Sequence, residues 1–85
     1  MRPVEPTILI TGAGSGLGRG LAVAWAKRGH LLLADRSAAG LQESETVVMA
    51  AGGTCRRIVL DVTDAAEIAR LVGKSDERID VLVNN

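Results

Sequence analysis

A cluster of glycines directly after a short apolar run most constrains how this chain can fold. The run Ile8-Leu9-Ile10 leads into Thr11–Gly18, where glycines occupy alternate positions: Gly12, Gly14, Gly16 and Gly18. A helix-like pattern follows over 17–28. A strand that turns at glycines and restarts as a helix presents unpaired backbone N–H groups and the positive end of the helix dipole. The segment predicts a pyrophosphate site. A ligand-free turn is the alternative, disfavoured because each glycine costs about 0.5–1 kcal/mol of folding entropy.

Composition limits the class of protein. The 85 residues allow one domain at most, and 47% of them are hydrophobic, with one Trp and no Phe or Tyr. An aliphatic core of this kind is typical of parallel sheets covered on both faces. The formal net charge is zero, and the basic residues are scattered, which argues against a nucleic-acid surface.

Cysteine content and terminal sequence indicate a compartment. The single cysteine, Cys55, excludes an intrachain disulfide and suits a reducing environment. We expect it in a strand, as a small buried hydrophobe. The first six residues lack the apolar region of a signal peptide. No apolar run approaches the roughly 20 residues needed to span a bilayer. These features favour a cytoplasmic protein that does not bind membranes.

Strand-like and helix-like patterns alternate along the whole chain. Strands are predicted over 8–11, 31–34, 57–60 and 79–83, and helices over 17–28, 37–51 and from 63 or 64 to about 72. In the first helix, Leu17, Leu21 and Trp25 recur at helical spacing and are expected to face the sheet. Gly29 is expected to end that helix in a left-handed conformation. Ser37 is expected to cap the second helix, and Gly52-Gly53 to stop it.

The order βαβαβαβ predicts an α/β fold. Right-handed helical crossovers between parallel strands give a doubly wound sheet with strand order 3-2-1-4. In such sheets the ligand lies at the carboxyl ends of the strands, near the point where the strand order reverses. The glycine segment lies at that edge.

A carboxylate stands at the same edge. Asp35 closes the second predicted strand, where it can accept hydrogen bonds from both hydroxyls of an adenosine ribose and would repel a 2′-phosphate. This favours NAD over NADP. Arg36 complicates the prediction, because a guanidinium there could stack on adenine or pair with a phosphate. A solvated turn at Asp35-Arg36 is the alternative interpretation.

The spacing of the glycines distinguishes between nucleotide-binding families. The general pattern G-x-G-x-x-G would need glycine at Leu17 or Arg19. The pattern T-G-x-x-x-G-x-G does fit, with Thr11, Gly12, Gly16 and Gly18. It resembles the cofactor loop of the short-chain dehydrogenase/reductase family, which implies a Rossmann-type sheet, here incomplete, and a nicotinamide dinucleotide.

The resemblance extends along the chain. Asp61-Val62 is similar to the family's D-V pair at the adenine ring, and Asn84-Asn85 to the opening of its N-N-A-G motif beside the cofactor ribose. Ser15 also implies NAD, since many NADP-preferring members carry a basic residue there. The implied cofactor-binding residues are Gly12, Ser15, Gly16, Leu17, Gly18, Asp35, Arg36, Asp61, Val62 and Asn85.

The implied reaction is hydride transfer between nicotinamide and a carbonyl or alcohol substrate. The family's catalytic groups are a serine and a Tyr-x-x-x-Lys arrangement. The 85 residues contain no tyrosine, so no catalytic residue is assigned. We expect 1–85 to be the N-terminal part of a single NAD(P)-binding domain, inactive alone and lacking the catalytic portion. The expected partners are the dinucleotide and a small carbonyl or alcohol substrate, and a homo-oligomer is compatible with the family.

Three other interpretations compete with this one. A noncatalytic nucleotide-binding module, or a truncated paralogue, would use the same loop. A nucleotide-sugar epimerase would usually show G-x-x-G-x-x-G, which the loop does not supply in register. Gly73-Lys74-Ser75 matches the end of a P-loop, but the first glycine of that motif would fall at Ile68. We therefore interpret that triplet as a helix end and loop, with Lys74 solvated.

Overall fold

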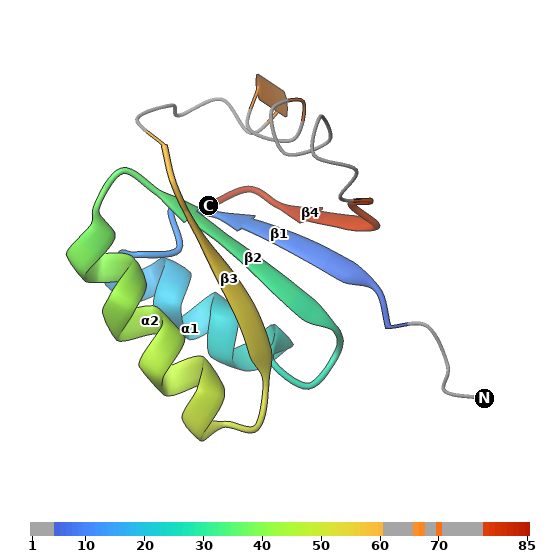
Figure 1. The fold of residues 1–85 in the computed structure, drawn as a ribbon, viewed down its shortest axis with the longest axis horizontal. Coiled ribbons are helices and arrows are strands. Elements are labelled where there is room, and N and C mark those ends of the chain that lie inside the picture. The colour runs from blue at the N-terminus through green and yellow to red at the C-terminus, as the bar shows by residue number, and fades with distance from the viewer. Residues whose placement is uncertain (1–4, 61–65, 68–69, 71–77) are drawn as a thin grey trace.

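The computed structural model describes residues 5–60, 66–67, 70 and 78–85. Its elements, in chain order, are β1 (Thr7–Thr11), α1 (Gly16–Trp25), β2 (His30–Asp35), α2 (Ala38–Ala50), β3 (Thr54–Val59) and β4 (Val81–Val83). The strands form one parallel sheet in the order β3-β2-β1-β4, which confirms the predicted α/β topology. Helices α1 and α2 cover the same face of the sheet (Figure 1). The helix predicted from residue 63 or 64 lies largely outside the described residues, as does the Gly73-Lys74-Ser75 triplet.

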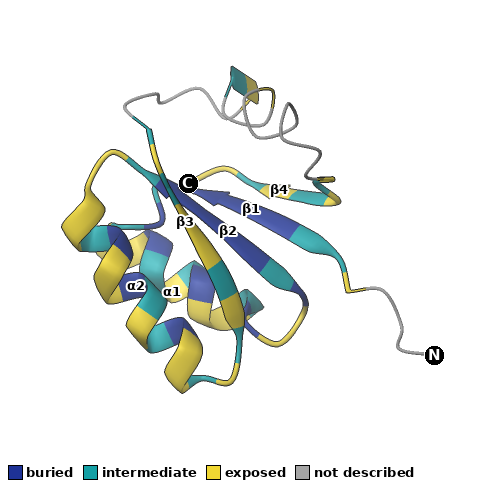
Figure 2. Cartoon of the chain, in the orientation of Figure 1, coloured by how far each residue is buried: buried dark blue, intermediate teal, exposed yellow. Residues whose placement is uncertain are grey.

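The two central strands are buried on both faces. On the helix side, Ile8, Ile10, Leu31 and Leu33 form one cluster. On the opposite side, Leu9 and Leu32 belong to a second cluster with Ala34. All of them are fully inaccessible, whereas β3 is largely exposed (Figure 2). The continuous apolar runs of β1 and β2 therefore reflect burial on both faces.

The prediction of which α1 residues face the sheet was wrong by one position along the chain. Leu17 is 71% exposed, and the buried residues are Gly18, Ala22 and Ala26. Leu21 and Trp25 are half-buried beside them, and Trp25 packs against the core as predicted. The reason is the close approach of α1 to the turn that follows β1. A Cβ at position 18 would lie 1.9 Å from the carbonyl oxygen of Gly12, so only the smallest residue fits there. The helix also ends earlier than predicted, in tight turns after Trp25.

The left-handed glycine lies at a different helix end from the one predicted. Gly29 does not have a positive φ. It is a glycine because a Cβ there would lie 2.2 Å from the carbonyl oxygen of Pro6. Gly52 has φ 87° and follows α2, where the Gly52 and Gly53 N–H groups donate to Met49 and Val48. This is a Schellman motif, and it confirms that Gly52-Gly53 stops α2.

The predicted cap of α2 and the strand position of Cys55 are confirmed. The Ser37 hydroxyl accepts a hydrogen bond from the Gly40 N–H at 3.0 Å. Cys55 lies in β3 and is half-buried. Burial, and to a smaller extent the Glu45 carboxylate, raise the pKa of the Cys55 thiol, while Arg57 opposes them. In the part of the chain that the structure describes, no helix has the length and apolar character to cross a membrane.

Candidate nucleotide-binding site

Three strands end at one edge of the sheet. The register pairs Thr11 of β1 with Ala34 of β2, and Ile10 with Val83 of β4, so the chain leaves all three strands at the same level. The turn that follows β1 begins at Gly12, whose φ is 63°. A Cβ at Gly12 would also lie 2.8 Å from the amide nitrogen of the Asn85 side chain. Both the backbone conformation and this contact require glycine.

Ser15 caps α1 and leaves two N–H groups without an acceptor in the described part of the chain. Its backbone is extended, its hydroxyl accepts from the Gly18 N–H at 3.1 Å, and it donates to the Gly12 carbonyl at 2.9 Å. The N–H groups of Gly16 and Leu17 have no acceptor among the described residues. They lie in the first turn, at the positive end of the helix dipole. This is the arrangement that binds anions.

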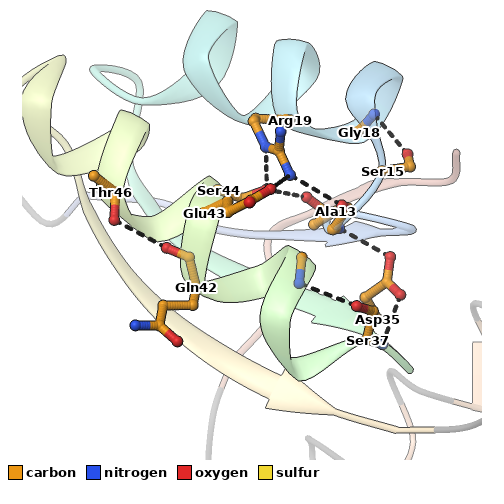
Figure 3. A network of polar contacts seen from close by, with 12 residues as sticks. Ala13, Ser15, Gly18, Arg19, Asp35, Ser37, Gln42, Glu43, Ser44 and Thr46 are labelled. Carbon is orange, nitrogen blue, oxygen red and sulfur yellow. Dashed lines mark hydrogen bonds and ion pairs between the residues drawn. The ribbon is translucent and has the colours of Figure 1, made fainter.

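Asp35 is fixed beside this turn. Its Oδ2 accepts from the Gly14 N–H, and its Oδ1 accepts from the Ser37 N–H, both at 2.9 Å (Figure 3). The carboxylate therefore joins the glycine loop to the start of α2. A carboxylate has about four acceptor positions, so about two remain for a ligand.

The residues after β4 close the other side of the loop. The Asn85 side-chain amide donates to the Gly12 carbonyl at 3.1 Å and to the Ser15 hydroxyl at 3.3 Å. The Thr11 hydroxyl accepts from the Asn85 N–H at 3.2 Å and donates to the Asn84 carboxamide oxygen at 3.1 Å. Asn84 and Asn85 are thus held against the glycine loop by their own groups and by the side chains of Thr11 and Ser15.

Most of the sequence-predicted residues meet at this edge. Those placed in or against the loop are Gly12, Ser15, Gly16, Leu17, Gly18, Asp35 and Asn85. Arg36 follows Asp35 and is exposed. Asp61 and Val62 lie outside the described residues, so their predicted contacts with adenine are not tested.

Sequence reasoning missed two residues behind the loop. The Arg19 guanidinium and the Ser44 hydroxyl bind the loop carbonyls of Gly14 and Ala13, at 3.2 and 2.5 Å. Two weak signals were available in the sequence. An arginine directly follows the last glycine of the motif, and a serine occupies a position in the middle of a helix, where its hydroxyl competes with the backbone unless it has another partner.

The fold and this edge define a parallel α/β sheet with a helix N-terminus and a carboxylate at its carboxyl end, which is the arrangement of a nucleotide-binding domain. Comparison with known proteins agrees with this class of fold. The family model described as short chain dehydrogenase matches residues 6–85. The chain therefore belongs to the short-chain dehydrogenase family.

Individual relatives support the assignment. The chain is 40% identical to galactitol 2-dehydrogenase of Agrobacterium fabrum, over all of this chain and 34% of that protein. The structure of a metagenomic short-chain oxidoreductase in complex with NADP aligns with a TM-score of 0.78 and 30% identity, covering 96% of this chain and 39% of that one. NAD⁺-bound xylitol dehydrogenase aligns with a TM-score of 0.77 and 29% identity, covering 99% and 34%. The chain spans about a third of the length of the curated relatives it matches.

Proposed function

We propose that the chain binds NAD at the carboxyl edge of the sheet. We further propose that it serves an oxidoreductase that transfers hydride between this cofactor and a carbonyl or alcohol substrate. The observation that carries the proposal is the pair of N–H groups on Gly16 and Leu17, which have no acceptor within residues 5–60, 66–67, 70 and 78–85 and lie beside a carboxylate already fixed in position. When bound, the dinucleotide would supply the hydride-carrying ring.

The pyrophosphate has partners of suitable chemistry. In the proposal, the pyrophosphate accepts hydrogen bonds from the Gly16 and Leu17 N–H groups. A Cβ added at Gly16 would meet no atom within 4 Å in the described part of the chain, so no contact with that part explains why this residue is glycine. Close approach of a ligand to the backbone does explain it. Asn85 and Ser15 hold the loop from the side of β4.

The preference for NAD rests on Asp35. Two backbone N–H groups hold its carboxylate, and its remaining acceptor positions suit the two hydroxyls of a ribose. A 2′-phosphate would bring a second negative charge to this carboxylate, which has no freedom to turn away without losing both hydrogen bonds. Arg36 is proposed to stack on the adenine, and Asp61 and Val62 to bind its edge.

The test is a pair of titrations on the complete natural polypeptide that contains these residues. Calorimetry with NAD and with NADP should give a dissociation constant at least about tenfold lower for NAD, equivalent to about 1.4 kcal/mol. Asp35→Asn, which removes the negative charge, should reduce the difference between the dissociation constants for NAD and NADP. Asp80→Asn is the matched control, because Asp80 holds the Thr7 N–H at the opposite edge of the sheet.

Three outcomes would contradict parts of the proposal. Tighter binding of NADP would overturn the cofactor preference, and absence of binding to either dinucleotide would overturn the function. Oxidation of NADH in the presence of a panel of aldehydes and ketones tests the hydride transfer. Binding without turnover across that panel, or across alcohols with NAD, would favour a noncatalytic nucleotide-binding module.

A further inference from the structure

The loop carbonyls present a problem for any anion that binds this turn. A backbone turn contains a C=O for each N–H, and a carbonyl oxygen aimed at a phosphate would repel it. The carbonyls of Gly12, Ala13 and Gly14 all lie in the turn. Each of them has a protein donor. Ser15 and Asn85 donate hydrogen bonds to the Gly12 carbonyl. Ser44 donates to the Ala13 carbonyl, and Arg19 donates to the Gly14 carbonyl.

Arg19 and Ser44 act together from behind the loop. The Ser44 hydroxyl is fully buried and donates to the Ala13 carbonyl at 2.5 Å while accepting from Arg19 Nε at 3.2 Å. Arg19 Nη2 donates to the Gly14 carbonyl at 3.2 Å and to a Glu43 carboxylate oxygen at 2.8 Å. Figure 3 shows this guanidinium between α1 and α2, with its donors directed at the loop and at α2.

The helix α2 also approaches the loop directly. A Cβ at Gly40 would lie 2.5 Å from the Gly14 carbonyl oxygen. The backbone of Gly14 is therefore held on several sides. Gly40 packs against its carbonyl, Arg19 donates to that oxygen, and Asp35 accepts from its N–H. The carbonyl belongs to the Gly14–Ser15 peptide, so a rotation that turned it toward the ligand would break its hydrogen bond from Arg19 and the one from the Ser15 N–H to the Gly12 carbonyl.

We propose that Arg19 and Ser44 are positioning residues for the pyrophosphate. By binding the carbonyls of Gly14 and Ala13, they turn those oxygens toward α2 and keep the N–H groups of Gly16 and Leu17 as the groups that face the anion. This inference rests on the proposed function and adds two residues to it, neither of which touches the ligand. The Glu43 carboxylate is 70% exposed, so its ion pair with Arg19 adds little to this role.

Arginine is needed at this position because of its geometry. The planar guanidinium reaches the Ser44 hydroxyl, the Gly14 carbonyl and Glu43 at once, whereas a lysine ammonium is a compact charge on a flexible stem. Arg19→Lys should therefore retain the charge and lose part of the positioning. Arg19→Met should lose the positioning hydrogen bonds entirely, while it keeps an unbranched side chain that a helix accommodates.

The experiment separates positioning from general damage by comparing two ligands. Adenosine contains the base and one ribose only, and ADP-ribose adds the pyrophosphate and a second ribose. In the complete natural polypeptide, Arg19→Met and Ser44→Ala should each raise the dissociation constant for ADP-ribose about tenfold, the loss expected when hydrogen bonds that orient a charged site are removed. Arg19→Lys should fall between these variants and the wild type. The dissociation constant for adenosine should change by less than about twofold.

Arg78→Met is the matched control, because Arg78 makes an exposed ion pair with Asp80 away from the loop. It should leave both constants unchanged. Equal losses for ADP-ribose and adenosine in Arg19→Met and Arg19→Lys would overturn the inference, since they would indicate a structural role alone. Wild-type affinity for ADP-ribose in Arg19→Met would also overturn it while leaving the proposed function intact. A wild type that binds neither ADP-ribose nor NAD would overturn both.

Discussion

The packing of α1 onto the glycine loop can be tested with a single methyl group. In Gly18→Ala the new Cβ would lie 1.9 Å from the Gly12 carbonyl oxygen, 2.7 Å from the Gly12 carbonyl carbon and 2.9 Å from the Ala13 Cα. All three are backbone atoms, so no side chain can rotate away. Ordinary contact begins at 3.4 Å, and the helix and loop must therefore separate by about 1.5 Å.

The expected change in stability is the difference between two opposing effects. Overpacking a site of this kind costs up to about 3 kcal/mol. Replacing glycine by alanine in a helix returns about 1 kcal/mol. We therefore expect Gly18→Ala to lower the free energy of unfolding by about 2 kcal/mol. It should also weaken NAD binding, because the separation moves the loop that carries the unpaired donors.

Gly20→Ala is the matched control. Gly20 lies in the same helix, and an added Cβ there would meet no other atom of the described residues within 4 Å, apart from its neighbours and the nearby helix backbone. This variant should raise the free energy of unfolding by about 0.5–1 kcal/mol. Urea denaturation followed by circular dichroism measures the free energy of unfolding of both variants. The dependence of that free energy on urea concentration should be unchanged. If Gly18→Ala proved as stable as Gly20→Ala, the close approach of α1 to Gly12 would be refuted.

Three further predictions concern the loop, the second helix and the cysteine. Gly16→Ala should leave stability unchanged or slightly raised and weaken NAD binding about tenfold, measured by calorimetry; unaltered binding would contradict ligand contact at Gly16. Ser37→Ala should lower the free energy of unfolding by about 1 kcal/mol in urea denaturation, since the Gly40 N–H loses its acceptor; an unchanged midpoint would contradict the cap. Because the pKa of the Cys55 thiol is raised, less thiolate is present at neutral pH, and iodoacetamide should alkylate it more slowly than an unstructured thiol, with the rate rising at alkaline pH. A faster reaction at neutral pH would contradict this.

The sequence was sufficient to predict the topology and the edge of the sheet at which most of the candidate site residues meet. The order of strands follows from the alternation of apolar runs and helical patterns, and the site follows from glycines placed after β1 and a carboxylate at the end of β2. Both signals are local in the chain. The Ser37 cap and the Gly52-Gly53 stop are local as well, and they were predicted correctly for the same reason.

The features that were missed depend on contacts between distant segments. Leu17 has the periodicity of a buried residue, but the approach of Gly18 to Gly12 rotates it into solvent. Gly29 follows a helix, yet its absent side chain makes room for Pro6. Arg19 and Ser44 are 25 residues apart and meet only when α1 and α2 pack together on the sheet. None of these contacts between distant segments can be predicted from a local pattern in the sequence.

The central claim is that the Gly16 and Leu17 N–H groups bind the anion, and their amide resonances test it most directly. In ¹⁵N-labelled protein titrated with NAD, both resonances should move downfield and saturate with the dissociation constant measured by calorimetry. The Val23 amide, whose residue lies farther along α1, provides an internal reference. If NAD bound while the Gly16 and Leu17 resonances stayed in place, the site proposed at the start of α1 would be wrong.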